Sequence, residues 1–223
     1  MLVEQSMHPD WLSNAFVLAV EDGPAVFVDS GAEVGPLVEA VERWRVKPVA
    51  LLRTHGHHDH VENEDELVRR YSIPVLAEPG EWQWDGLRVQ AVATPGHSDD
   101  GVSFVVDEGI VATGDTLFRD AVGGGDVAAV RRSVMEVLLE LPDATRVLPG
   151  HTDETTIGRE RRANPFVRVW SGAEQEGSER VRVEGRDATL LVWSPDYDGK
   201  GKAWVRFDGG GEAIVGGSRV ERG

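Results

Sequence analysis

Short apolar segments alternate with polar turns along the first two thirds of the chain, which is the pattern of a protein with several strands. The apolar runs at residues 15–20 and 25–31 are separated by Glu-Asp-Gly-Pro, and we expect them to pair as a β-hairpin. A second hairpin is predicted over residues 102–115, with its turn at Asp107–Gly109. Further strands are predicted where an apolar run ends in a polar loop, at residues 48–55, 87–97 and 145–151.

Helical spacing of apolar residues recurs in three segments, at residues 36–44, 61–72 and 127–141. The segment 61–72 begins with acidic residues and ends with arginines, as the helix dipole favours. Hairpins followed by strand–helix–strand units predict a chain of helices and strands with more than one sheet. We expect its chemistry at the C-terminal ends of the strands, where polar residues recur.

The pattern changes after Trp170. Residues 173–179 have the composition of a linker, and four or five short apolar segments with glycine-rich turns follow them. The charge changes at the same place, because residues 1–165 hold 29 acidic and 14 basic residues while residues 166–223 hold 10 and 9. We therefore predict a first domain over residues 1–166 and a small, barrel-like β-module over residues 173–223.

The composition of the chain excludes several classes of protein. With 223 residues, of which 40% are hydrophobic, the chain can bury a sizeable core. No apolar run approaches the roughly 20 residues of a membrane helix, and the first residues lack the basic and apolar regions of a signal peptide. The chain has no cysteine, which excludes disulfides, thiolate metal sites and cysteine nucleophiles. We expect a cytoplasmic protein without a membrane partner, and its formal charge of −16 disfavours nucleic acid as a partner.

Histidine positions are the most informative feature of the sequence. Four of the seven histidines lie in Thr-His-Gly-His-His-Asp-His at residues 54–60. His97 and His151 each end a predicted strand, and Asp115 follows a fourth strand. Three separate segments thus place histidines at strand ends, which indicates a metal site.

The spacing inside the histidine motif suits two ions. In an extended segment residues i and i+2 point the same way, so His55 and His57 can bind one ion. Asp59 and His60 point elsewhere, which suits a second ion nearby. This is not the helical pair of an HExxH metalloprotease. Imidazole and carboxylate ligands without thiolates suit Zn²⁺, Mn²⁺ or Fe²⁺.

The motif THGHHDH, followed by TPGH, TGD and LPGH, closely resembles the metallo-β-lactamase superfamily over residues 10–165. The resemblance implies an α+β fold, an αββα sandwich with a two-metal site on one edge, and a catalytic role for the first domain. It also implies three ligands for each ion and one bridging aspartate. The first set is His55, His57 and His97, the second set is Asp59, His60 and His151, and the bridge is Asp115.

Two further residues are expected to support the histidine motif. Asp29 matches an aspartate that orients the histidine loop in this family, and we expect Thr54 to assist it. His58 falls at a variable position of the motif and is expected to face solvent.

Some branches of the superfamily are disfavoured by the sequence. Lactone hydrolases use a tyrosine near the metals, whereas this chain has no tyrosine between Tyr71 and Tyr197. Nuclease branches need a basic surface. The stretches GDTLFRD at residues 114–120 and PGHTDETTIGRERRANPF at residues 149–166 resemble the glyoxalase II-like hydrolases, which cleave thioesters. The β-module stands where glyoxalase II has a helical, glutathione-holding domain, so another thiol carrier fits as well.

The resemblance implies a binuclear metal-dependent hydrolase. A metal-bridging hydroxide would attack the carbonyl of a thioester or related small acyl ester, and Asp59 would also orient or deprotonate this nucleophile. The expected cofactors are two divalent ions, Zn²⁺ first, with Fe²⁺ or Mn²⁺ open. The alternative is a mononuclear iron persulfide dioxygenase with His55, His97 and Asp115 as ligands.

The expected partner is a small-molecule substrate, and the sequence leaves open whether the chain forms a homodimer.

A group of aromatic residues near the C-terminus has two interpretations. They form either a binding surface or the core of the β-module and its contact with the sandwich. These residues are Trp170, Trp193, Tyr197 and Trp204.

Overall fold

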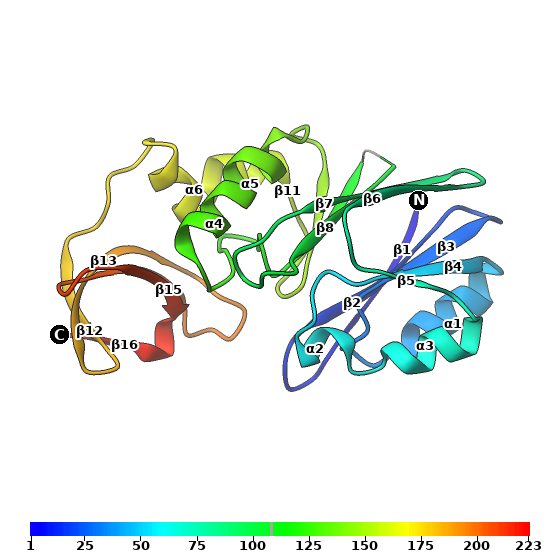
Figure 1. The fold of residues 1–223 in the computed structure, drawn as a ribbon, viewed down its shortest axis with the longest axis horizontal. Coiled ribbons are helices and arrows are strands. Elements are labelled where there is room, and N and C mark those ends of the chain that lie inside the picture. Colours follow the sequence, from blue (N-terminus) through cyan, green and yellow to red (C-terminus); the bar gives the residue numbers. More distant parts are fainter. Residues whose placement is uncertain (108) are drawn as a thin grey trace.

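Two mixed β-sheets lie face to face in this computed structural model, which describes residues 1–107 and 109–223 (Figure 1). The first sheet has the strand order β1-β2-β3-β4-β5, and the second has the order β11-β10-β9-β8-β7-β6. The strands of the first sheet are β1 (Leu2–Met7), β2 (Asn14–Ala19), β3 (Pro24–Val28), β4 (Lys47–Leu52) and β5 (Val75–Leu76). Those of the second are β6 (Gly80–Trp84), β7 (Leu87–Ala93), β8 (Val102–Val106), β9 (Ile110–Gly114), β10 (Arg146–Pro149) and β11 (Thr155–Thr156).

Apolar side chains of both sheets form one core between them, because alternate residues of a strand point to the same face. Phe16 and Leu18 of β2 contribute to this core from one side, and Phe104 of β8 from the other. Helices cover the outer faces and bury two further apolar clusters. They are α1 (Gly35–Trp44) and α3 (Glu64–Tyr71) on the first sheet, and α4 (Val127–Arg132), α5 (Ile157–Ala163) and α6 (Pro165–Trp170) on the second. The predicted α+β sandwich is therefore confirmed.

The chain after residue 178 forms a third sheet, here called the C-terminal sheet, with the order β15-β14-β13-β12-β16 (Figure 1). The strands that come first and last along the chain, β12 and β16, lie next to each other in this sheet. The chain makes a 3₁₀ turn after β15, and β16 then pairs with β12. Its strands are β12 (Glu179–Val183), β13 (Arg186–Ser194), β14 (Lys202–Phe207), β15 (Glu212–Gly216) and β16 (Val220–Arg222). The sequence predicts four or five strands here, and five are formed.

Two predicted helices differ from the structure in detail. The helix predicted over residues 61–72 forms only over Glu64–Tyr71, which is α3. A separate short helix, α2 (His58–Val61), lies before it, and the chain turns between the two at residues 62–63. The Asn63 side-chain amide donates to the carbonyl oxygens of Ser30 and Ala32, at 3.0 and 3.1 Å, and ties this break to the loop after β3. The segment 127–141 begins as α4 and continues as a π turn (Ser133–Val137) and a 3₁₀ turn (Leu138–Glu140). The turn predicted at Asp107–Gly109 includes residue 108, which lies outside the described residues.

Polar loops leave both sheets at one edge of the sandwich. β3 and β4 run parallel, as do β9 and β10, so the C-terminal ends of each pair lie at the same edge of their sheet.

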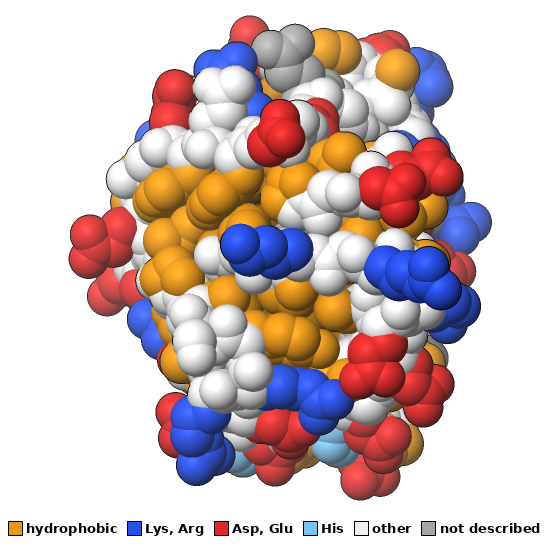
Figure 2. All heavy atoms as spheres, turned by 90° about the vertical axis from the view of Figure 1, so that its right-hand side faces the viewer, with side chains coloured by type: hydrophobic (Ala, Val, Ile, Leu, Met, Phe, Trp, Pro, Cys, Tyr) orange, Lys and Arg blue, Asp and Glu red, His pale blue; other side chains and the backbone are white. Residues whose placement is uncertain are grey.

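At the face that lies on the right of Figure 1, hydrophobic side chains gather between charged ones (Figure 2). Within residues 1–107 and 109–223, no helix is long and apolar enough to cross a membrane.

Candidate metal centre

The seven side chains that the sequence selects as metal ligands come together at this edge. His55 and His57 follow β4, and Asp59 and His60 lie on the short helix α2. The other three follow the ends of β7, β9 and β10; they are His97, Asp115 and His151. Loops of both sheets thus converge on one place.

The first ligand group consists of three histidines. The Nε2 atoms of His55 and His97 each lie 3.0 Å from Nδ1 of His57. His55 is buried, whereas His57 is exposed and His97 is partly so. Three imidazole nitrogens that point at one another can all ligate a single ion placed between them.

The second ligand group combines Asp59, His60 and His151. The Asp59 carboxylate lies 3.4 Å from Nε2 of His151 and 3.8 Å from Nε2 of His60. Asp115 lies between the two groups. One of its oxygens is 3.3 Å from His60 Nε2, and the other is 3.4 Å from both His97 Nε2 and His151 Nε2. A carboxylate in this position can bind two ions at once.

Two buried atoms of this cluster lack a hydrogen-bond partner among the described residues. They are Nε2 of His60 and Oδ1 of Asp115. An unpaired buried polar atom costs about 1–3 kcal/mol, and a cation between the two atoms would satisfy both. The side chains therefore fit a bound metal ion better than they fit one another.

Hydrogen bonds behind the cluster fix the orientation of the histidine rings. Asp29 accepts hydrogen bonds from Thr54, through its backbone N–H and its hydroxyl at 2.8 Å each, and from Nδ1 of His60 at 2.9 Å. Nδ1 of His97 donates to the carbonyl of Gly124 at 2.8 Å, and Nδ1 of His151 donates to that of Leu12 at 3.0 Å. Three rings thus present Nε2 to the cluster, as partners behind metal ligands commonly arrange. Asp29 and Thr54 thus lie directly behind the ligands, bonded to each other and, through Asp29, to His60.

Burial and the neighbouring charges shift the pKa values of the cluster. Burial lowers the pKa of His55 to about 4. Burial also acts to lower the pKa of His60 and His151, but Asp115 outweighs it and the values rise to about 11 and about 9. Burial acts to raise the pKa of Asp115, yet His60 and His151 hold it well below the usual range. A divalent cation would take the place of the protons that His60 and His151 hold.

The two remaining histidines lie outside the cluster. His58 is exposed, as predicted, and its ring meets Trp11 edge-on with 5.0 Å between the ring centres. His8 stacks on the same Trp11 ring at 4.2 Å. The sequence motif therefore contains one histidine, His58, that is not directed at the other ligands.

Tyr197, one of the aromatic residues near the C-terminus for which the sequence leaves two interpretations, lies beside the ligands. Its ring stacks on His151 with 4.1 Å between the ring centres and an angle of 12° between the planes. The lack of a tyrosine between Tyr71 and Tyr197 therefore does not disfavour the lactone hydrolases, because the loop between β13 and β14 brings Tyr197 from the C-terminal sheet to His151.

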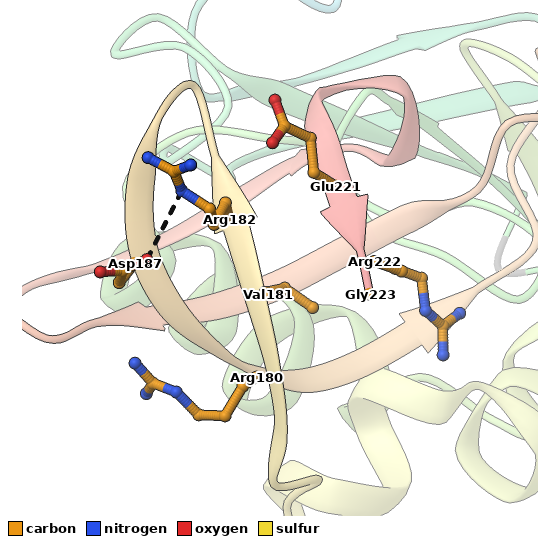
Figure 3. Close-up of a pocket in the computed structure, with 7 residues that line it drawn as sticks. All are labelled: Arg180, Val181, Arg182, Asp187, Glu221, Arg222 and Gly223. Carbon is orange, nitrogen blue, oxygen red and sulfur yellow. Dashed lines mark ion pairs between the residues drawn. The ribbon is translucent and has the colours of Figure 1, made fainter.

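Several cavities of about 300–440 Å³ in the described part of the chain have a size that suits small molecules. One, of about 370 Å³, is lined by Tyr197, which stacks on His151, and is here called the Tyr197 cavity. Its apolar lining consists of Met7, Leu12, Pro195 and Tyr197, and its polar lining of Arg119, Asp120, Thr152, Asp153 and Asp196. Another, of about 300 Å³, lies on the C-terminal sheet around Val181 (Figure 3). Each arginine beside it pairs with a carboxylate; Arg182, for example, lies 3.5 Å from Asp187.

Comparison with known proteins agrees with this fold. The family model described as the metallo-beta-lactamase superfamily matches residues 8–86. An uncharacterized protein of Mycobacterium tuberculosis is 33% identical over 206 residues, which cover 69% of this chain and 92% of that protein. A probable metallo-hydrolase of Bacillus subtilis is 30% identical over 199 residues, covering 71% and 94%. A hydroxyacylglutathione hydrolase of Haemophilus influenzae is 28% identical over 195 residues, covering 69% and 92%.

Solved structures give the same result. The B3 metallo-beta-lactamase BLEG-1 superposes with a TM-score of 0.69 at 28% identity, covering 74% of this chain and 99% of its own. ETHE1 from Myxococcus xanthus superposes with a TM-score of 0.68 at 25% identity, covering 78% and 92%. A protein solved in a di-iron-bound form is 33% identical with a TM-score of 0.62, covering 72% and 98%. The chain belongs to the metallo-β-lactamase superfamily and is similar to its glyoxalase II-like members.

Proposed function

We propose that this protein is a metal-dependent hydrolase that holds two divalent ions and cleaves a thioester or a related small acyl ester. The observation that carries the proposal is the place of Asp115, whose two oxygens lie 3.3–3.4 Å from histidines of both ligand groups. Relatives named as a metallo-hydrolase and as a hydroxyacylglutathione hydrolase support this reaction class.

When bound, two divalent ions would activate a water molecule and polarise the acyl carbonyl. His57 and Asp59 are the ligands most open to solvent, so the substrate reaches the cluster from their side. Asp59 is placed to orient the attacking water or to take its proton, because its carboxylate is only partly buried and lies beside the other ligands of the second group. A thiolate leaves without help from a general acid, because a free thiol has a pKa of only about 8.5.

The metal content of the purified protein tests the proposal. We expect two divalent ions per chain in the unaltered protein, and a clear loss in His57→Ala. His58→Ala is the matched control, because it removes the neighbouring imidazole that faces Trp11 and not the cluster. Release of thiol from a panel of thioesters then tests the reaction. A chain that binds no metal after reconstitution would contradict the proposal.

A mononuclear iron dioxygenase is the second candidate. Its ligands would be His55, His97 and Asp115, which lie together here. The similarity to ETHE1 from Myxococcus xanthus is the observation that favours this candidate. The complete second group of Asp59, His60 and His151 favours the binuclear hydrolase. One iron per chain, with oxygen uptake on addition of glutathione persulfide, would favour the dioxygenase instead.

A further inference from the structure

The C-terminal sheet contacts the metal centre at two places. On one side Tyr197 covers the ring of His151. On the other side Ile214 of β15 forms a β-bridge with Gly125, and the neighbouring Gly124 accepts the hydrogen bond of His97. A single sheet therefore borders a histidine of each ligand group.

These contacts are held in place by a shared core. Leu191, Val192 and Trp204 of the C-terminal sheet belong to the same apolar cluster as Trp170 of α6 and Val130 of α4. The rings of Trp170 and Trp204 meet with 6.1 Å between their centres. This shared core holds the C-terminal sheet, to which the Tyr197 loop belongs, against the sandwich.

The Tyr197 cavity adjoins the second ligand group. Three of its lining residues are linked to His151: Tyr197 stacks on its ring, Leu12 accepts its Nδ1 hydrogen bond, and Thr152 follows it in the chain. A molecule whose reacting carbonyl lies at the ligands can therefore extend into this cavity. The loop of the C-terminal sheet forms one of its walls.

Charges in and around the cavity cancel in pairs. Each of its three aspartates has a cationic partner at 2.8–3.1 Å. The pairs are Asp120 with Arg159, Asp153 with Arg119, and Asp196 with Lys202. Its remaining lining is mostly apolar, so an uncharged and partly apolar group fits it better than a charged one.

We propose that the Tyr197 cavity binds an uncharged thiol carrier, and that Tyr197 is a specificity-determining residue which the C-terminal sheet adds to the metal centre. This inference rests on the proposed thioester hydrolysis for its substrate class. It distinguishes the chain from a glutathione-specific enzyme, because glutathione carries two carboxylates and needs cationic partners that are not already paired.

Two acetyl thioesters that differ in the charge of the carrier test the inference. One is the thioester of N-acetylcysteamine, which is uncharged, and the other is that of glutathione. In the unaltered protein we expect a higher kcat/KM for the uncharged carrier. Tyr197→Ala is expected to raise KM for this substrate about tenfold, the usual effect of removing a wall of an apolar pocket. Tyr197→Phe, which keeps the ring, should retain the preference, and Lys200→Ala on the same loop is the control.

A charge variant gives an independent readout. Asp153→Asn removes the partner of Arg119 and leaves a cation beside the cavity. We expect it to shift the ratio of the two kcat/KM values about fivefold toward the glutathione thioester, as one exposed charge allows. Equal kcat/KM values in the unaltered protein, or an unchanged ratio in both Tyr197→Ala and Asp153→Asn, would overturn the inference.

Binding without turnover separates this inference from the proposed function. The S-methyl ether of N-acetylcysteamine cannot ligate a metal as a thiolate, so saturation-transfer NMR reports its contact with the protein alone. We expect a signal with the unaltered protein and Tyr197→Phe and none with Tyr197→Ala. If neither thioester is hydrolysed but this signal depends on Tyr197, the reaction is wrong and the binding site stands. If hydrolysis occurs and the signal is absent or ignores Tyr197, the site is wrong.

Discussion

Gly150 leaves no room for a side chain beside the metal centre. A Cβ atom at this position would lie 2.2 Å from Oδ1 of Asp115 and 2.7 Å from Cε1 of His60. Both contacts are far shorter than van der Waals distance, so the two ligands would have to move. The glycine before His151 is therefore part of what shapes the cluster.

We expect Gly150→Ala to lose bound metal, because Asp115 lies between the two ligand groups and His60 belongs to the second. Gly35→Ala is the control, since a Cβ there meets no atom within 4 Å. Elemental analysis of the two purified variants gives the comparison. Full metal content in Gly150→Ala would contradict the geometry described for Asp115.

Residue types and their spacing reveal much of the candidate site. Histidines placed after strand ends could be selected because strands that run parallel end at one edge, and the structure brings all seven selected side chains together. The sequence could not place Tyr197 or Leu12 beside His151. Tyr197 reaches His151 only through the packing of the C-terminal sheet, and Leu12 acts through a carbonyl group that every residue possesses.

At the scale of elements, α5 and α6 are joined by a buried glutamate. Glu160 is fully buried and accepts hydrogen bonds from Thr155, Arg159 and Asn164 at 2.6–3.0 Å, and from the backbone N–H of Asp120 at 2.8 Å. The stretch of residues 155–165 thus has a structural role, because it closes the sandwich and holds the loop after β9.

Glu160→Ala is expected to lower the free energy of unfolding by about 3 kcal/mol, because it leaves the donors around it without an acceptor. Urea denaturation measures this difference. Glu39→Ala on the exposed side of α1 is the matched control and should change the value by less than about 0.5 kcal/mol. A loss as small as that of the control would show that the network contributes little.

Hairpins and strands were predictable from alternation, whereas helix continuity was not. The hairpin of β2 and β3 and that of β8 and β9 lie where the sequence places them. The break before α3 depends on the Asn63 side chain reaching the carbonyls of Ser30 and Ala32, which lie about 30 positions earlier. Contacts between residues so far apart along the chain leave no periodic pattern in the sequence.

At the scale of the whole molecule, the C-terminal sheet and the sandwich share one apolar cluster. The sequence predicts a boundary near residues 166–173, and this domain division stays a prediction. Four side chains of the C-terminal sheet are buried in the cluster; they are Leu191, Val192, Trp204 and Ile214. Burying each is worth about 1.5–3 kcal/mol, and their sum approaches the roughly 5–15 kcal/mol by which folded proteins are stable.

Removing residues 173–223 is therefore expected to give an insoluble protein without bound metal. Solubility after expression and elemental analysis of any soluble fraction measure this. The control is a Gly-Ser-Gly insertion between Gln175 and Glu176, which lengthens the connecting segment at little cost and leaves the cluster intact. A soluble truncated chain with two metal ions would contradict this expectation.

The bridge between Ile214 and Gly125 limits how this protein can be recombined. A chimera made by joining residues 1–172 to a different C-terminal module would lack the backbone partner of the loop that orients His97, as well as the ring that covers His151. Residues 173–178 are a convenient place to join two sequences. In the folded molecule, however, the parts of the chain before and after them are packed against each other. A replacement module must therefore contain an edge strand that pairs with Gly125 and a loop that covers the His151 ring.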